Sequence, residues 1–235
     1  GVARVTVAAP VRIAILATGS ELRRAGEEAG DGSIYDSNGP MLAALLASPA
    51  VSVTALRVGD ELGAIVGTLR SLARTMDMVV TTAGMADGSR DHVRTAVEDA
   101  GGRLEVVRVA MKPGKPLVFG RVGEADFLGL PGNPVSAFVV FCLFARPFLL
   151  RRMGAEVQPA ASFTVPAGFD WPKPGARREF LRARLQDGWA MLYPNQSSGV
   201  LTSLAWADGL VDVEAGSSVM NGDPVRFLPL SELLK

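Results

Sequence analysis

Short runs of branched apolar residues alternate with segments of helical spacing over the first 150 residues. The run 11–17 (VRIAILA) is typical of a buried strand, and residues 61–74 carry apolar side chains at helical spacing. Strands that alternate with helices favour a mostly parallel sheet with helices on both faces, so the predicted fold class is α/β. The expected strands are residues 11–17, 51–58, 76–82, 104–110, 117–121 and 127–130, and the expected helices are residues 41–47, 61–74, 91–100 and 135–152.

The pattern changes near Gly154. Beyond it, short strand-like runs are separated by turn residues such as Asn-Gly-Asp-Pro at 221–224, which is typical of a small β domain. The first residue is glycine rather than methionine, so we expect a truncated or processed start. The predicted organisation is a linker over 1–10 from an absent N-terminal region, an α/β domain over 11–153 and a small C-terminal β domain over 154–235. The strands expected in that domain are residues 162–165, 179–185, 190–193, 210–214 and 225–228.

Composition excludes several classes of function. Lysine plus arginine and aspartate plus glutamate each number 24, so the basic surplus that favours nucleic-acid binding is lacking. A single cysteine, Cys142, excludes a disulfide framework and a cysteine-rich zinc site, and a single histidine, His92, excludes a multi-histidine metal site. Any metal would need oxygen ligands, which indicates magnesium. The most apolar stretch, 137–145, is too short to cross a bilayer, so we expect a cytoplasmic protein.

Four loops that each follow an expected strand carry residues suited to anions. Parallel sheets bind ligands beyond the carboxyl ends of their strands, where these loops should gather. Loops 18–21 (TGSE) and 81–89 offer backbone N–H groups, loop 111–116 (MKPGKP) offers two lysines stiffened by prolines, and loop 130–136 (LPGNPVS) begins a helix. The alternative for each is an ordinary turn.

Carboxylates also fall near the expected strand ends. Scattered acids are usually solvated surface, whereas acids that converge beside cationic loops suit magnesium and phosphate together. A Ser-His-Asp arrangement is disfavoured, because no serine or cysteine nucleophile is evidently placed for His92, and Cys142 lies within an apolar helix that indicates a core position. The acids are Glu21, Asp36, Asp60, Asp87 and Asp91.

Four motifs occur in a fixed order along the chain: TGSEL at 18–22, DSN at 36–38, MKPGKP at 111–116 and LPGNPVS at 130–136. Together they resemble the molybdopterin molybdenumtransferase family, to which the E domain of gephyrin belongs. The resemblance implies a molybdopterin-binding α/β domain followed by a small β domain. It also implies an elongated homodimer whose cleft draws on the partner subunit and on two preceding domains that this chain lacks.

The implied reaction inserts molybdate into adenylylated molybdopterin and releases AMP, with Mg²⁺ assisting. Matching positions imply catalytic roles for Glu21, Asp60, Asp91, Lys112 and Lys115, with Asp60 and Asp91 as metal ligands. The molybdopterin adenylyltransferase that makes the substrate is an expected partner, and neither nucleic acid nor membrane is expected. The implied substrate contacts are Thr18, Gly19, Ser20, Ser37, Asn38, Gly84, Gly88, Arg108, Pro131, Gly132, Asn133 and Ser136.

The loop 82–91 departs from the family pattern. The family reads S-G-G-x-S-x-G-x-x-D, whereas this chain reads TAGMADGSRD, so Ala83 and Ala86 replace a glycine and a serine and Asp87 is an added acid. A negative charge there weakens phosphate binding unless magnesium bridges it. Two alternatives follow: an adenylyltransferase that consumes ATP, which the C-terminal β segment disfavours, and a non-catalytic, gephyrin-like scaffold, which the altered loop permits.

Overall fold

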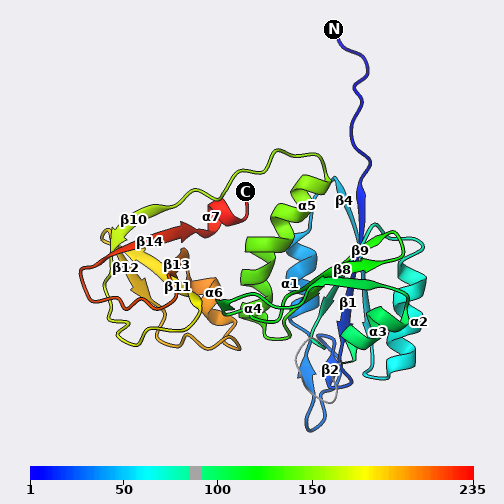
Figure 1. Ribbon diagram of the computed structural model, residues 1–235, viewed down its shortest axis with the longest axis horizontal. Coiled ribbons are helices and arrows are strands. Elements are labelled where there is room, and N and C mark those ends of the chain that lie inside the picture. Colours follow the sequence, from blue (N-terminus) through cyan, green and yellow to red (C-terminus); the bar gives the residue numbers. More distant parts are fainter. Residues whose placement is uncertain (85–91) are drawn as a thin grey trace.

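The computed structural model describes residues 1–84 and 92–235, and these form two six-stranded sheets and a small two-stranded one (Figure 1). Within the described residues the first sheet has six strands in the order β4-β1-β5-β9-β8-β6. Its first four strands are parallel, while β8 and β6 are antiparallel to their neighbours, so the prediction of a mostly parallel sheet is confirmed. The bounds are Val11–Thr18 for β1, Val51–Val58 for β4, Met78–Thr82 for β5, Arg103–Val106 for β6, Val118–Val122 for β8 and Ala125–Leu130 for β9.

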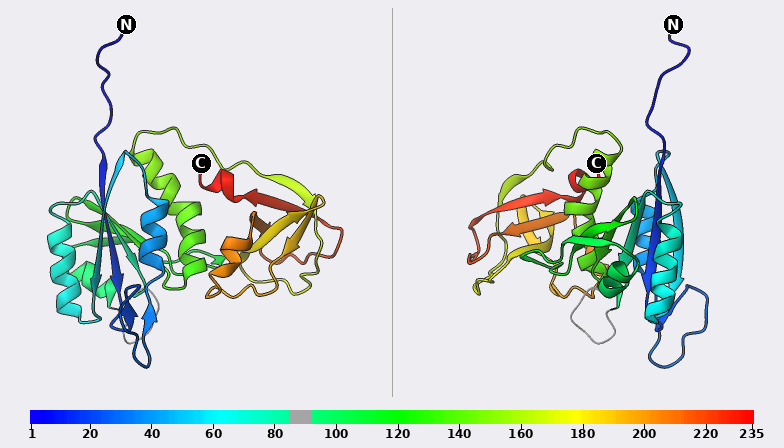
Figure 2. Two further views of the ribbon diagram at one scale, coloured as in Figure 1. Left: turned by 180° about the vertical axis from the view of Figure 1, so that it is seen from behind. Right: turned by 45° about the vertical axis from the view of Figure 1, so that its right-hand side comes forward.

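Helices cover both faces of this sheet. Figures 1 and 2 show α1, α4 and α5 between the two sheets, and α2 and α3 on the far side of the first. Alternate residues of β1 enter opposite cores: Ile13 and Ile15 pack with α1 and α4, and Ala14 and Leu16 pack with α2 and α3. Burial on both faces explains why residues 13–17 are continuously apolar, whereas Arg12 near the start of the strand is exposed. The bounds are Asn38–Leu45 for α1, Leu62–Leu72 for α2, Val93–Asp99 for α3, Pro134–Val140 for α4 and Arg146–Arg152 for α5.

The second sheet is antiparallel along its path β10-β14-β13-β11-β12 and has its own apolar core. Two short helices, α6 and α7, lie beside it and were not expected from the sequence. The bounds are Phe163–Pro166 for β10, Arg178–Gln186 for β11, Trp189–Leu192 for β12, Thr202–Trp206 for α6, Gly209–Val213 for β13, Pro224–Pro229 for β14 and Leu230–Leu233 for α7.

A two-residue strand connects the two sheets. The strand expected over 104–110 is too long, because β6 ends at Val106 and the chain then leaves the first sheet. Met111–Lys112 (β7) pairs in parallel with the start of β11 in the second sheet before the chain returns as β8. The loop 111–116, here called the lysine loop, is thereby attached to both sheets.

The helix expected over 135–152 is one helical run whose hydrogen bonding changes along its length. Between α4 and α5, Phe141–Ala145 forms a π-helical turn (η1), and Pro147, which has no N–H to donate, follows it in the first turn of α5. In the described part of the chain, the run Pro134–Arg152 is the one helix long and apolar enough to cross a membrane, yet 56% of its most apolar window is buried against the protein. Burial also raises the pKa of the Cys142 thiol to about 12, in keeping with a core position.

Candidate functional site

A cavity of about 450 Å³, here called the first cavity, opens at the carboxyl ends of β1, β5 and β9. It lies where the loops after parallel strands were expected to meet. Thr18 and Thr82 end two of these strands, and the third strand is followed by the turn at Pro131 and Gly132. The wall is completed by Glu21, Leu22, Ile34, Tyr35, Asp36, Ser37, Asn38, Ala83, Gly84, Pro116, Asn133, Pro134 and Ser136.

The start of α1 presents an unused hydrogen-bond acceptor to the first cavity. The Asp36 carboxylate accepts a hydrogen bond from the Gly39 N–H (2.9 Å) and so caps the helix. The Asn38 Nδ2 donates to the Gly132 carbonyl at 2.7 Å, which fixes the orientation of the amide. Its Oδ1 is buried and has no hydrogen-bond partner within the described residues. A buried acceptor of this kind is satisfied when a ligand donates an N–H to it.

Close backbone approaches shape the floor of this cavity. Ala83 and Gly84 both have a φ of +70°, the left-handed region that favours glycine. A Cβ on Gly84 would lie 2.3 Å from the Val93 Cγ2, and a Cβ on Gly132 would lie 3.1 Å from the Ala83 Cβ. Gly132 therefore allows the loop after β9 to touch Ala83 in the loop after β5, and Gly84 allows the loop after β5 to approach Val93 of α3.

One wall of the first cavity is a segment that the sequence did not reveal as strands. Leu22–Arg23 (β2) and Ile34–Tyr35 (β3) pair in parallel, and the Ile34 N–H also donates to the Glu21 carbonyl. We refer to residues 19–36 as the β2–β3 segment.

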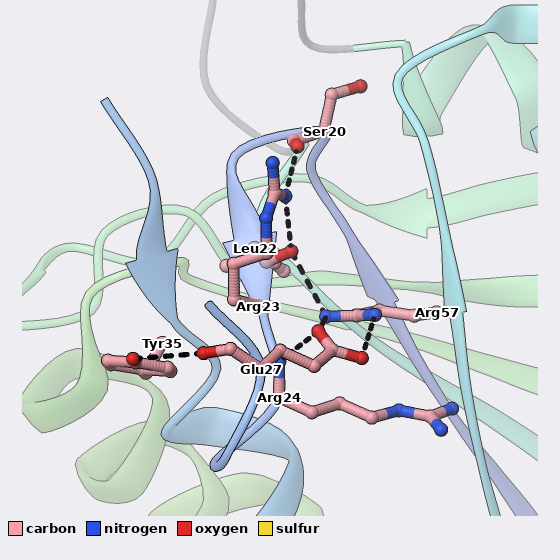
Figure 3. Close-up of polar contacts among 7 residues, drawn as sticks. All are labelled: Ser20, Leu22, Arg23, Arg24, Glu27, Tyr35 and Arg57. Atoms are coloured by element: carbon pink, nitrogen blue, oxygen red, sulfur yellow. Dashed lines mark hydrogen bonds and ion pairs between the residues drawn. The ribbon is translucent and has the colours of Figure 1, made fainter. Parts of the chain in front are cut away.

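A buttress from β4 holds the β2–β3 segment in place (Figure 3). The Arg57 guanidinium reaches both carboxylate oxygens of Glu27 at 3.1 and 3.2 Å and also donates to the Leu22 carbonyl. The Arg24 N–H donates to Glu27 at 2.7 Å, and the Tyr35 hydroxyl donates to the Glu27 carbonyl. The hydrogen bond from the Arg24 N–H, followed by those from Arg57, lowers the pKa of Glu27.

A second cavity of about 390 Å³ lies between the lysine loop and the second sheet, and it shares Pro116 and Ser136 with the first. Lys112 and Lys115 line it. The Lys112 Nζ lies 3.3 Å from the buried Glu179 carboxylate of β11. The two cavities are therefore contiguous, and the second is bounded by cationic side chains.

A fully buried arginine also lines the second cavity. Arg182 of β11 is 1% exposed and donates to the Ser203 Oγ and the Ser197 carbonyl, both at 3.1 Å. Within the described residues no carboxylate pairs with it. Burial lowers its pKa to about 10, so it stays cationic at neutral pH. Sequence reasoning missed Arg182 together with Arg177, Gln196, Ser197 and Ser198, because no local pattern relates this region to the lysine loop.

The structure brings most of the expected site residues to these cavities. Lys112, Lys115 and Ser136 line the second cavity. The expected residues in the wall of the first are Thr18, Glu21, Ser37, Asn38, Gly84, Pro131, Gly132, Asn133 and Ser136.

Other expected residues lie elsewhere. Asp60 accepts a hydrogen bond from the Ser20 N–H at 2.9 Å, and its own N–H donates to the Ser20 Oγ, so this pair joins the ends of β1 and β4. Asp60, Gly19 and Ser20 are not among the residues that line either cavity, and neither is the exposed Arg108. Gly88 and Asp91, with Ala86 and Asp87, lie outside the described residues. Among the residues described, no three acids, histidines or cysteines gather to hold a metal ion.

Comparisons with known families match both parts of the chain. Residues 14–151 match the family described as "Probable molybdopterin binding domain", and residues 164–230 match the "MoeA C-terminal region (domain IV)". The chain is 36% identical to molybdopterin molybdenumtransferase 2 of Mycobacterium tuberculosis over 91% of its own length and 55% of that protein. It is 34% identical to the Drosophila melanogaster molybdenum cofactor synthesis protein cinnamon, over 88% of this chain and 35% of that protein.

A solved structure has the same fold. The crystal structure of the molybdopterin biosynthesis MoeA protein of Pyrococcus horikoshii superposes with a TM-score of 0.79 at 27% identity, and it covers 94% of this chain and 54% of that one. The chain thus spans about half the length of the relatives first matched.

Proposed function

The chain belongs to the MoeA family and corresponds to the C-terminal portion of its members, and from that premise we propose that its two adjoining cavities take the substrates of molybdenum insertion. In the proposed reaction, molybdate is inserted into adenylylated molybdopterin and AMP is released. The activity is proposed for the whole protein, a cytoplasmic homodimer that receives its substrate from the molybdopterin adenylyltransferase.

The main support for the proposal is that the two cavities adjoin each other. Molybdate must approach the dithiolene of the pterin while both are bound, and the cavities share the wall at Pro116 and Ser136. The unpaired Oδ1 of Asn38 suits an N–H of a pterin ring in the first cavity. The cations Lys112, Lys115 and Arg182 suit a tetrahedral dianion in the second.

Different side chains are proposed to orient the pterin, to offset the charge of molybdate and to orient the attacking water. In the proposed mechanism Asn38 orients the pterin, and the lysines offset the charge of molybdate as it meets the dithiolene. Release of AMP adds water across a phosphoanhydride bond, so one phosphate leaves with adenosine and the other stays on the pterin. Glu21, in the wall of the first cavity, is the acid proposed to orient that water.

The expected magnesium site at Asp60 and Asp91 stays a prediction. Asp60 is occupied by the Ser20 N–H, and no three-membered cluster of metal-ligating side chains is present in residues 1–84 and 92–235. The other expected ligand, Asp91, lies outside the described residues, and the mechanism proposed above uses no ion.

The test is nucleotide chromatography after the protein is mixed with adenylylated molybdopterin, with and without molybdate. We expect AMP only with molybdate, and we expect Lys115→Ala to slow its release at least about tenfold through loss of a charged contact. Lys173→Ala removes an exposed lysine outside both cavities and is the matched control. If the protein neither releases AMP nor retains the adenylylated pterin, the proposal is overturned.

Two further mixtures, one with molybdopterin and ATP and one with a partner peptide, separate the two alternatives. Consumption of ATP with molybdopterin would establish an adenylyltransferase instead. A partner peptide bound without any pterin binding, and bound equally well by Lys115→Ala, would establish a scaffold.

A further inference from the structure

Four arginines gather around a third cavity, at the end of the first sheet remote from the site described above. The cavity has a volume of about 490 Å³ and lies near the start of β9, whereas the first cavity lies beyond its end. Arg103 comes from β6, Arg121 from β8, and Arg151 and Arg152 from the last turn of α5. We call it the arginine cavity.

Strand register places like charges directly opposite each other here. Arg103 pairs across the ladder with Arg121, and Arg121 pairs in turn with Asp126 of β9. Cross-strand neighbours point to the same face of a sheet, and like charges in such pairs destabilise it. An anion bound between the two arginines removes that repulsion.

A buried carboxylate fixes two of the four guanidinium groups. The Asp126 side chain is 2% exposed, and its oxygens lie 3.2 Å from the Arg121 Nε and 3.1 Å from the Arg152 Nε. Neither guanidinium donates a hydrogen bond within the described residues, so the terminal Nη groups stay available. Arg151 likewise has no side-chain partner within the part of the chain that the structure describes, and Arg103 pairs only with the exposed Glu105 at 2.9 Å.

The cavity therefore keeps an excess of positive charge beside an apolar surface. Two carboxylates, Glu105 and Asp126, line the cavity with the four arginines, and Asp77, which is paired with Arg12, also attracts Arg152 from outside it. Phe119 and Phe148 form the apolar part, with ring centroids 5.0 Å apart in an edge-to-face arrangement. Guanidinium groups recognise phosphate through paired N–H donors, and arginines oriented in advance bind it with less loss of side-chain entropy.

We propose that the arginine cavity is a binding site for the phosphate group of a small phosphorylated molecule. The Nη groups of Arg121 and Arg152, held from behind by Asp126, receive the phosphate oxygens, and Arg103 and Arg151 close over them from the rim. The cavity volume suits a small molecule, and the zero net charge of the chain disfavours a nucleic acid as the source of the phosphate. The site is independent of the proposed function.

The experiment is calorimetric titration with inorganic pyrophosphate at low ionic strength. Lys112→Gln/Lys115→Gln serves as the starting protein, because it weakens anion binding in the second cavity. We expect this protein to bind one pyrophosphate, and we expect a further Arg103→Gln/Arg151→Gln change to weaken that binding about tenfold or more. Both arginines are exposed, and unchanged thermal unfolding would show that the variant folds.

Arg184→Gln in the same starting protein is the control, because Arg184 is a half-exposed arginine of the second sheet. We expect pyrophosphate binding to be unaffected by it. The absence of binding in the starting protein would overturn the proposal. An equal loss in the control and in the Arg103/Arg151 variant would also overturn it, since attraction would then follow total charge rather than this cavity.

Discussion

Ala83 is held in a backbone conformation that alanine rarely adopts. Its φ of +70° places it in the left-handed region, while its N–H donates to the Leu130 carbonyl and its Cβ would lie 3.1 Å from a Cβ on Gly132. The hydrogen bond and the packing fix the end of β5 against the end of β9. The strain is therefore located in the floor of the first cavity, at a position where the resemblance implies glycine.

Ala83→Gly should stabilise the protein by about 1 kcal/mol, because glycine adopts a positive φ without the steric cost of a Cβ. Chemical denaturation followed by far-UV circular dichroism measures the change. Ala64→Gly, at an exposed position in the first turn of α2, is the control and should destabilise by up to about 1 kcal/mol. A loss of stability in both variants would show that the methyl of Ala83 contributes more through packing than it costs in strain.

Asp77 should make stability sensitive to acid. The hydrogen bonds that Arg12 donates from its side chain and its backbone lower the pKa of Asp77 from 3.8 to about 2. A lowered pKa means that the folded protein binds the proton less readily than the unfolded chain, so the stabilisation is complete above pH 3.8 and is lost as the pH falls through about 2.

Asp77→Asn should accordingly lower the melting temperature at pH 6 and have a smaller effect at pH 3. Thermal unfolding at both pH values measures this, with the exposed Glu28→Gln as control. If Asp77→Asn changes the melting temperature by the same amount at both pH values, the lowered pKa assigned to Asp77 is contradicted.

At the scale of elements, the sequence was informative where a pattern repeats. Apolar runs identified the long strands, and glycine, proline and lysine motifs identified the loops after them, because parallel strands bring such loops to one edge. Two-residue strands such as β2, β3 and β7 carry no periodicity. Arg182 could not be assigned to the site because its partners depend on how the second sheet packs against the lysine loop.

The β2–β3 segment should depend on the buttress from β4. Arg57→Gln removes the bonds to Glu27 and to the Leu22 carbonyl, so amide hydrogen exchange should become faster over residues 19–36. The change in global stability should stay within about 1 kcal/mol, because the pair is partly exposed. Arg70→Gln on α2 is the control. Exchange that is unchanged in this segment, or faster throughout the protein, would contradict the role assigned to Arg57.

At the scale of the whole molecule, one apolar core joins the two sheets. The cluster that contains Val135 and Phe141 of the long helical run also contains Phe180, Leu210 and Leu228 of the second sheet. Strand β7 adds main-chain pairing between the two halves. Neither half buries the apolar surface of this shared cluster without the other, so the two halves should unfold together.

Tryptophan fluorescence tests this, because Trp171, Trp189 and Trp206 all lie in the second half of the chain. Circular dichroism at 222 nm follows the helices, most of which belong to the first half. We expect the two signals to give one urea midpoint. Two separate midpoints would show that the halves fold independently.

The crossing of β7 also restricts how such a protein can be recombined. The lysine loop belongs to the first half of the chain, yet its position is fixed by an edge of the second sheet. A second domain grafted from an unrelated protein would need an edge that accepts β7 at the same register, or the two lysines would lose their placement. In evolution by exchange of gene segments, the two halves would therefore be inherited as one unit.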